Sequence, residues 1–397
     1  MQLVYTLAGL LFWILAFLVF YTYAGYGLLI WLLVKLRPPR PESPMPTRLP
    51  TVTMVVPAYN ERDYLPQKLQ NCLDQDYPAE LMTLLFVVEG STDGSAEYLA
   101  TRQAALPQLQ VQSGTERLGK IMAINRAMPL VSTDLTIFTD ANTQLNIEAV
   151  SRIVRRFSPA DVGAVTGEKR ISVAGKESAA GSGEGLYWRY ESFLKKMDAL
   201  LHTIVGAAGE LFAIRTALYE PVEADTLLDD FIISLRIAER GYRVDYAPDA
   251  YALERPSQSV GEETKRKVRI AAGGFQAIRR LRPLFNVFRY GWLSFQYVSH
   301  RVLRWAVTPF CLPLLLLLNL LLVTQPNAGF WWLMLLGQVL FYAVAAVGYQ
   351  LENRQTRWKL TFVPFYFVFM NGCVLAGFLR YKRGNLSGVW EKSRRAV

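Results

Sequence analysis

The chain has 397 residues, of which 52% are hydrophobic, 13% aromatic and only 19% charged, and its net charge is +10. Disordered chains are far less apolar and soluble domains carry about 25% charged residues, so neither class fits this composition. Two histidines and three cysteines argue against a His-rich metal site, a Ser–His–Asp triad and a paired disulfide framework. The positive charge suits either nucleic acid or the cytoplasmic loops of a membrane protein.

The N-terminal segment has the features of a membrane anchor. Residues 3–34 contain no charged residue, and a helix needs only about 20 apolar residues to cross a bilayer. No basic region precedes this segment and no small-residue cleavage site follows it, so we expect a retained anchor over 1–36 rather than a signal peptide. Positive charge beside a span marks the cytoplasmic side, which puts the middle of the chain in the cytoplasm. This charge is carried by Lys35, Arg37, Arg40 and Arg48.

Between about 50 and 280, short apolar runs alternate with segments of helix length. The pattern predicts strands over 51–56, 81–88 and 135–140, and helices over 61–75, 94–105 and 119–130. Nearly continuous apolar strands that alternate with helices are typical of a parallel-rich sheet covered on both faces. Because ligands of such sheets bind beyond the carboxyl ends of the strands, the loops that follow the strands form the candidate site.

Polar residues follow each of these strands directly, in the segments 57–61, 89–94 and 140–142. Taken singly, each loop contains residues that are common in turns, and Asp93 would simply cap the next helix. Taken together, the loops would gather oxygen ligands for a divalent cation and a ribose at one edge of the sheet. Lys120 adds a cation that could meet a phosphate.

Four motifs in this order, VVPAYNE, VVEGSTDGS, RLGKIMAINRA and FTDANT, resemble the nucleotide-sugar half of a membrane-embedded family 2 glycosyltransferase. The resemblance continues through GAAGELFAIR, TLLDDFIISLRIAERGYRV and RKVRIAAGGFQ, and it covers about 50–280. It implies an α/β domain of the Rossmann-like GT-A fold with a parallel-rich central sheet. This domain would lie in the cytoplasm and be flanked by N- and C-terminal transmembrane helices.

The resemblance also implies a donor site for a nucleoside-diphosphate sugar, which we expect to be UDP-linked. The family's D-x-D metal motif is matched by Asp140 and Asn142, which would hold Mg²⁺ or Mn²⁺ to neutralise the leaving diphosphate. Glu89 stands where the family usually has Asp, and Asn142 keeps an oxygen ligand without its charge. The expected donor contacts are Pro57, Ala58, Tyr59, Glu61, Glu89, Asp93, Lys120, Asp140, Arg266 and Arg269.

Two adjacent aspartates, Asp229 and Asp230, precede a helix that should end near Arg240, with Gly241 as its C′ residue. By themselves they would be interpreted as favourable charges at a helix N-terminus. By the resemblance, Asp230 is the catalytic base and Asp229 its acidic neighbour. A carboxylate in this place can take the proton of an acceptor hydroxyl, and a single displacement without a covalent intermediate inverts the sugar carbon.

The expected acceptor contacts are Gly209, Glu210, Tyr187 and Trp188, although an aromatic pair on a helix is more often packing. Polymerising members of the family carry Q-x-x-R-W before a glycine. Counting back from Gly273, this chain has Arg266, Arg269 and Ile270 at those positions. Isoleucine offers no aromatic face for stacking on a growing glycan, so transfer of a single sugar to a lipid carrier stays an alternative.

Three more apolar stretches, at about 302–324, 329–350 and 360–379, lie within a membrane region over 301–380. The aromatic segment 281–300 precedes them and should lie in the membrane interface, and a basic tail over 381–397 follows. Three full spans would put this basic tail outside the cell. We therefore expect 360–379, which contains Pro364 and Asn371-Gly372, to be re-entrant.

These expectations describe a hexosyltransferase of polysaccharide biosynthesis, multi-pass in a bacterial inner membrane, with a saccharide or lipid-linked acceptor. Whether a partner protein completes an export path stays open. A non-catalytic membrane scaffold is the main alternative, supported only by the departures at Glu89, Asn142, Arg266 and Ile270. The basic residues border the apolar stretches and form no aromatic-basic platform, so we expect no nucleic-acid partner.

Overall fold

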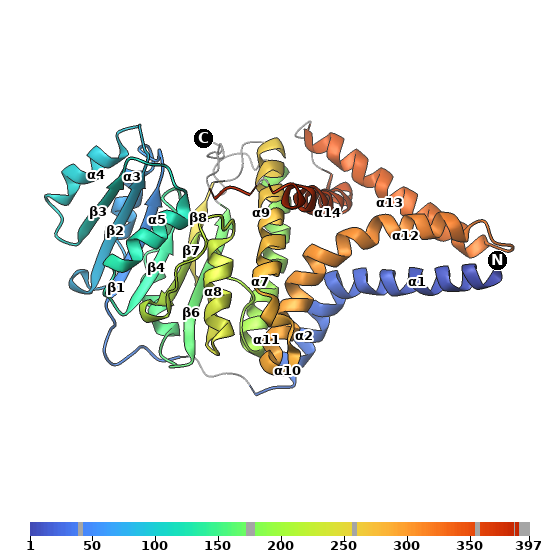
Figure 1. Ribbon diagram of the computed structural model, residues 1–397, viewed down its shortest axis with the longest axis horizontal. Coiled ribbons are helices and arrows are strands. Elements are labelled where there is room, and N and C mark those ends of the chain that lie inside the picture. Colours follow the sequence, from blue (N-terminus) through green and yellow to red (C-terminus); the bar gives the residue numbers. More distant parts are fainter. Residues whose placement is uncertain (39–42, 172–178, 256–259, 354–357, 385, 389–397) are drawn as a thin grey trace.

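The computed structural model describes the chain except for residues 39–42, 172–178, 256–259, 354–357, 385 and 389–397, and it describes α7 over 179–187 by its backbone alone. Figure 1 shows two parts that lie side by side. One is an α/β domain around a sheet, and the other is a group of long helices that contains the N-terminus.

A mixed sheet forms the centre of the α/β domain. Within the described residues it has eight strands in the order β3-β2-β1-β4-β7-β6-β8-β5. The pairs among β1 to β4 are parallel, as is β6 with β8, whereas β7 and β5 run antiparallel to their neighbours. The predicted parallel-rich sheet is thus confirmed. Its strands are β1 (Val52–Ala58), β2 (Met82–Glu89), β3 (Leu109–Gly114), β4 (Leu135–Thr139), β5 (Gln144–Leu145), β6 (Val162–Ile171), β7 (Leu211–Arg215) and β8 (Arg243–Glu254).

Apolar residues on both faces of the sheet bury two separate cores. Successive side chains of a strand point to opposite faces. Met54 and Val56 therefore pack into one core, while Val55 packs into the other. The first core is covered by α3 (Leu65–Leu73), α4 (Ser95–Gln103) and α6 (Ala149–Arg156). The second is covered by α5 (Lys120–Ala127) and α8 (Asp229–Glu239).

The described residues include four helical stretches long and apolar enough to cross a membrane: Gln2–Lys35, Trp292–Leu322, Gly329–Glu352 and Leu360–Lys382. In Figure 1, α1 and α12 run side by side away from the α/β domain. The helix α7 (Ala179–Leu201) packs on both the sheet and α2 and so joins the two parts. The elements of the stretches are α1 (Gln2–Phe20), η1 (Tyr21–Gly25), α2 (Tyr26–Lys35), η6 (Tyr297–Val307), α12 (Thr308–Leu322), α13 (Gly329–Asn353) and α14 (Lys359–Lys382).

The segment before the second long stretch is divided into short helical elements. It forms the short turns η5 (Arg282–Phe285) and α10 (Val287–Tyr290), which Asn286 caps by accepting hydrogen bonds from two backbone N–H groups. Gly291 then adopts a φ of 49°, which favours glycine. From α11 (Trp292–Gln296) the helix continues into η6 and α12, so this stretch begins earlier than the sequence suggested.

The break expected within 360–379 is also wrong, because α14 is one continuous helix that contains Pro364. Asn371 bonds to the carbonyl of Phe367 within the helix at 2.8 Å and accepts a hydrogen bond from Tyr23, so its amide does not interrupt the helix. Figure 1 shows α14 end-on, across the direction of α1 and α12. It packs against α9 (Val260–Arg280).

Candidate active site

A cavity of about 280 Å³ lies at the carboxyl ends of β1, β2 and β4. The loops after these strands reach it together with the start of α5, the start of α8 and one face of α9. The structure therefore brings together almost all of the residues singled out by the sequence. Those that line the cavity are Pro57, Ala58, Tyr59, Glu61, Glu89, Lys120, Asp140, Asn142, Gly209, Glu210, Asp229, Asp230, Arg266 and Arg269.

Three predicted residues are not among those that line this cavity. Asp93 accepts hydrogen bonds from the backbone N–H of Arg62 at 2.9 Å and from the hydroxyl of Ser95 at 2.6 Å, so it ties the loop after β1 to the start of α4. The ring centre of Trp188 lies 5.3 Å from Lys169 Nζ. Lys169 in turn pairs with Glu210, which lines the cavity. The side chain of Tyr187 lies outside the described residues.

The end of the cavity near β2 holds a buried carboxylate. Glu89 is only 4% exposed and its Oε1 is paired with Arg126, while its Oε2 has no hydrogen-bond partner in the described part of the chain. Burial raises the pKa of Glu89 more than Arg126 lowers it. Gly114 makes room for this pairing, because a Cβ there would lie 2.6 Å from Arg126 Nη2.

Arg117 forms part of the same wall, although it was not among the predicted site residues. Its guanidinium lies over the ring of Tyr59, 3.9 Å from the ring centre. Planar cation–aromatic contacts of this kind provide a flat surface against which a base could lie. Arg117 belongs to the RLGK motif, so the sequence carried a signal that could have identified it. Glu254 also lines the cavity without having been predicted, as does Gly388, which lies beyond α14.

Lys120 joins the two sets of acidic residues. It begins α5 directly after Gly119, which has a φ of 92°, and it lines the cavity. Its Nζ lies 2.6 Å from Asp140 Oδ1 and 3.8 Å from Asp229 Oδ2. Burial opposes the charged form, but Asp140, Asp229 and Asp230 outweigh it and raise the pKa of Lys120 above its ordinary value. Lys120 is therefore a fixed cation between two acidic groups.

Asp229 and Asp230 occupy the first turn of α8, which ends before Gly241, as predicted. Burial and the charge of Asp229 raise the pKa of Asp230 to about 7, against the opposing effect of Lys120. A Cβ on Gly209 would lie 3.2 Å from Asp230 Oδ2, so the backbone of the GAAGELFAIR motif forms the floor beneath this carboxylate. A carboxylate with this pKa can accept a proton near neutral pH.

The remaining wall combines arginines of α9 with a buried ion-pair group. Burial lowers the pKa of Arg269 to about 10, which still leaves it cationic at neutral pH. Lys169 is fully buried and pairs with Glu254 and with Glu210, the latter at 2.5 Å. Burial disfavours the charge of Glu210, but Lys169 outweighs this and holds its pKa well below the ordinary range. Both signs of charge are thus fixed around one cavity.

Asp140 and Asn142 are the residues that could hold a metal, because both line the cavity with side-chain oxygens. No group of three or more His, Cys, Asp or Glu residues with metal-binding geometry occurs among the described residues. Magnesium and manganese commonly take only one or two protein carboxylates and complete their shell with phosphate and water. The donor set therefore fits a metal that arrives with a diphosphate.

Comparison with known proteins places this site in a family. The model of "Glycosyltransferase like family 2" matches residues 50–273. Poly-beta-1,6-N-acetyl-D-glucosamine synthase of Staphylococcus aureus strain MSSA476 is 26% identical over 60% of this chain and 57% of its own length. The synthase of the same name from Staphylococcus epidermidis strain ATCC 35984 is 24% identical over 58% and 56%. The chain thus matches less than three fifths of the length of these relatives.

A solved structure has a similar fold over almost its whole length. The mannosyltransferase from Pyrobaculum calidifontis, in complex with GDP-Man and Mn²⁺, matches with a TM-score of 0.70 and 23% identity, over 94% of this chain and 99% of the other. The GT-A fold is therefore confirmed, and the non-catalytic scaffold is not supported. The chain belongs to family 2 of the glycosyltransferases, and its relatives include polysaccharide synthases.

Proposed function

We propose that the chain is an inverting, metal-dependent glycosyltransferase that moves a sugar from a UDP-linked donor to a saccharide or lipid-linked acceptor at the cytoplasmic face of a bacterial inner membrane. The observation that carries the proposal is the shared cavity. Asp140 and Asn142 lie on one side, Asp229 and Asp230 on the other, and Lys120 between them. An enzyme that joins two substrates needs both sites to open on one space.

Different residues of the cavity would remove the acceptor proton and bind the donor phosphates. Asp230 takes the proton of the acceptor hydroxyl as this oxygen attacks the sugar carbon, and its raised pKa suits that role. Asp229 keeps the pKa of its neighbour high. Arg269 lines the cavity and can bind phosphate oxygens bidentately, while Arg266, which also lines it, is itself held by two hydrogen bonds to Glu263. One base and one displacement leave the configuration of the sugar carbon inverted.

Asp140 and Asn142 would hold the divalent cation, Mg²⁺ or Mn²⁺. When bound, the cation supplies charge neutralisation for the departing diphosphate. Asp140 is already oriented into the cavity by its ion pair with Lys120. The ammonium of Lys120 can then turn to a phosphate oxygen, since a lysine has several rotatable donors.

The free oxygen of Glu89 favours uracil as the donor base. Glu89 Oε1 is occupied by Arg126, which leaves Oε2 as a single acceptor in the buried wall. Uracil presents one imide N–H, whereas guanine presents two adjacent N–H groups to a carboxylate. The names of the staphylococcal relatives point to N-acetylglucosamine as the sugar, while the similar solved structure holds GDP-Man. Both donors are therefore worth testing.

Ile270 favours transfer of a single sugar over polymer synthesis. It lines the cavity at the position where polymerising family members carry tryptophan. An aliphatic side chain offers less area and no aromatic face to hold a glycan end after each addition. The acceptor contacts that stay proposals are Gly209, Glu210, Tyr187 and Trp188, with Trp188 and Lys169 behind Glu210.

The arrangement of the long helices supports a membrane topology in which the α/β domain and the basic tail share the cytoplasm. The proposed division is an anchor over 1–36, an enzyme domain over 50–280, interfacial helices over 281–300, transmembrane or re-entrant helices over 301–380 and a basic tail over 381–397. If α1–α2, α12 and α13 cross and α14, which packs against α9, lies along the membrane surface, three crossings keep the end of α14 on the side of the α/β domain. Residues 385 and 389–397 of the tail lie outside the described residues. Basic residues then stay inside, as is usual.

Mass analysis of products tests the proposal. The purified chain is incubated with UDP-N-acetylglucosamine, UDP-glucose or GDP-mannose, with Mn²⁺ or Mg²⁺, and with inner-membrane lipid as the acceptor source. We expect a UDP-sugar to give a product one sugar heavier than its acceptor, only with metal present. Transfer from GDP-mannose alone would refute the uracil assignment, and a ladder of longer products would refute single transfer.

A further inference from the structure

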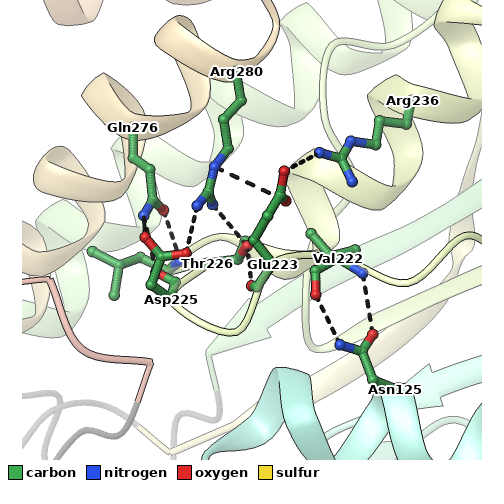
Figure 2. Close-up of polar contacts among 9 residues, drawn as sticks. Asn125, Val222, Glu223, Asp225, Thr226, Arg236, Gln276 and Arg280 are labelled. Atoms are coloured by element: carbon green, nitrogen blue, oxygen red, sulfur yellow. Dashed lines mark hydrogen bonds and ion pairs between the residues drawn. The ribbon is translucent and has the colours of Figure 1, made fainter.

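A short segment before the proposed base is held by side chains from three helices. Residues 222–228, which we call the clamped segment, lead from the sheet to Asp229 and Asp230. Figure 2 shows the side chains that hold it. From α5, Asn125 donates to the carbonyl of Val222 at 2.8 Å and accepts from its N–H at 3.2 Å. From α8, Arg236 pairs with Glu223 at 2.6 Å.

Most of the contacts come from α9. Gln276 accepts a hydrogen bond from the N–H of Leu227 at 3.1 Å and donates to the carbonyl of Asp225 at 2.9 Å. Arg280 donates to Thr226 Oγ1 at 2.8 Å and pairs with Asp225 at 2.5 Å. Gln276 is 5% exposed, so it makes these hydrogen bonds to the backbone of the segment from the protein interior. Its amide matches both a backbone donor and a backbone acceptor, which no charged or apolar side chain can do.

Packing leaves the clamped segment little freedom beside these bonds. Gly273 lies one helical turn from Gln276, and a Cβ there would come within 2.8 Å of Leu228 and 2.9 Å of Leu227. Leu228 is the N-cap residue of α8, directly before Asp229. Backbone contact at Gly273 and hydrogen bonds at Gln276 therefore fix the start of α8 against α9.

The same face of α9 also reaches the cavity. Arg266, Arg269, Gly273, Gln276 and Arg280 follow one another at intervals of three and four residues, the spacing of one helical face. Arg266 and Arg269 line the cavity, while Gln276 and Arg280 hold the clamped segment. One rigid helix thus sets the distance between the phosphate-binding arginines and the carboxylates at the start of α8.

We propose that Gln276, supported by Arg280, is a positioning residue that sets the location of Asp230 relative to the bound donor. This inference rests on the proposed role of Asp230 as the base. Gln276 is not among the residues that line the cavity, so its loss should leave donor binding intact and slow the chemical step. A misplacement of about 1 Å in a catalytic group can cost about 100-fold in rate.

The test compares Gln276→Leu and Gln276→Glu with the wild-type full chain in detergent. Leucine removes both hydrogen bonds, and glutamate keeps the acceptor for Leu227 but turns a negative oxygen towards Asp225. We expect kcat to fall about 100-fold, while calorimetry with UDP and Mn²⁺ gives Kd values within about twofold of wild type. Arg279→Gln is the matched control, because Arg279 is an exposed neighbour on the same helix.

A second measurement separates the inference from the proposed function. Hydrogen–deuterium exchange over 222–231 reports the clamp whether or not the chain transfers sugar. Loss of one hydrogen bond of about 1 kcal/mol should speed exchange of the Leu227 amide about fivefold in Gln276→Leu and leave Arg279→Gln unchanged. Unchanged exchange would overturn the clamp. Faster exchange with an undiminished kcat would overturn the positioning role.

A second variant covers the case in which Gln276→Leu does not fold. Arg280→Ala removes the pairing with Asp225 and the hydrogen bond to Thr226; the side chain of Asp225 is 52% exposed, so water can replace the lost partner there. We expect a smaller fall in kcat, about tenfold, again without a change in the affinity for UDP and Mn²⁺. A rise in Kd with constant kcat would show that α9 supports donor binding instead, and it would refute the inference.

Discussion

The proposed base predicts a specific dependence of activity on pH. The pKa of Asp230 is raised to about 7 by burial and by Asp229. A carboxyl group accepts a proton only when ionised, so the active form increases as pH rises through this value. At one unit below the pKa about a tenth of the group is ionised, and kcat/KM should therefore fall about tenfold from its plateau near pH 8 to pH 6.

Replacing Lys120 should change the pKa of Asp230 in a direction that the structure predicts. Its ammonium lies 3.8 Å from Asp229 Oδ2, and at about 4 Å two charges interact by about 4 kcal/mol with an effective dielectric constant of 20. Asp230 experiences part of this field, and one pKa unit corresponds to about 1.4 kcal/mol. Lys120→Met removes the cation that lowers the pKa of Asp230, so the acidic limb should move upward by about one unit.

The assay is the initial rate at low donor concentration, from about pH 5 to pH 9 at constant ionic strength. The affinity for UDP and Mn²⁺ is measured at each pH, because Lys120 also faces the phosphates. Values of kcat at saturating donor then isolate the base. A wild-type profile that is flat between about pH 6 and pH 8 would refute the assignment of the base. The assignment would also be refuted if the acidic limb of the Lys120→Met profile stayed at the wild-type pH or moved to lower pH.

Further changes test the metal site, the donor wall and the fold. Asp140→Ala should weaken the Mn²⁺-dependent binding of UDP about tenfold or more, and calorimetry with unchanged affinity would count against the metal site. Glu89→Gln should release Arg126 and lower the affinity for UDP about tenfold; equal affinities would remove Glu89 from the donor site. Gly206→Ala should destabilise the fold by about 2–3 kcal/mol, because Gly206 has a φ of 89° and a Cβ there would lie 2.1 Å from Phe231. A melting temperature equal to that of wild type would contradict this.

Much of the site could be predicted because strand ends mark it. Short apolar runs predicted β1, β2 and β4, and the polar residues after them line the cavity. The helix after Asp229 and Asp230 ends at the expected glycine. These are local signals: a buried strand, a turn and a helix cap each leave a pattern within a few residues. The resemblance to the family then joined segments that lie far apart in the chain.

What the sequence could not predict depends on contacts between distant segments. Asp93 has the same residue type and strand-end position as its neighbours, yet it bonds to Arg62 and Ser95 and not into the cavity. Arg126 reaches Glu89 only because β3 ends in Gly114 beside it. The helix α14 is continuous through Pro364, and Asn371 within it bonds to Phe367 and Tyr23, contacts that composition does not predict.

The most direct test of the account replaces the base and leaves its shape. Asp230→Asn keeps the size of the side chain but cannot accept the proton of the acceptor. We expect sugar transfer, followed by mass analysis with a UDP-sugar and Mn²⁺, to fall about 100-fold to 10,000-fold while the affinity for UDP and Mn²⁺ stays at the wild-type value. Full turnover by Asp230→Asn, or loss of transfer together with loss of UDP binding, would contradict the account.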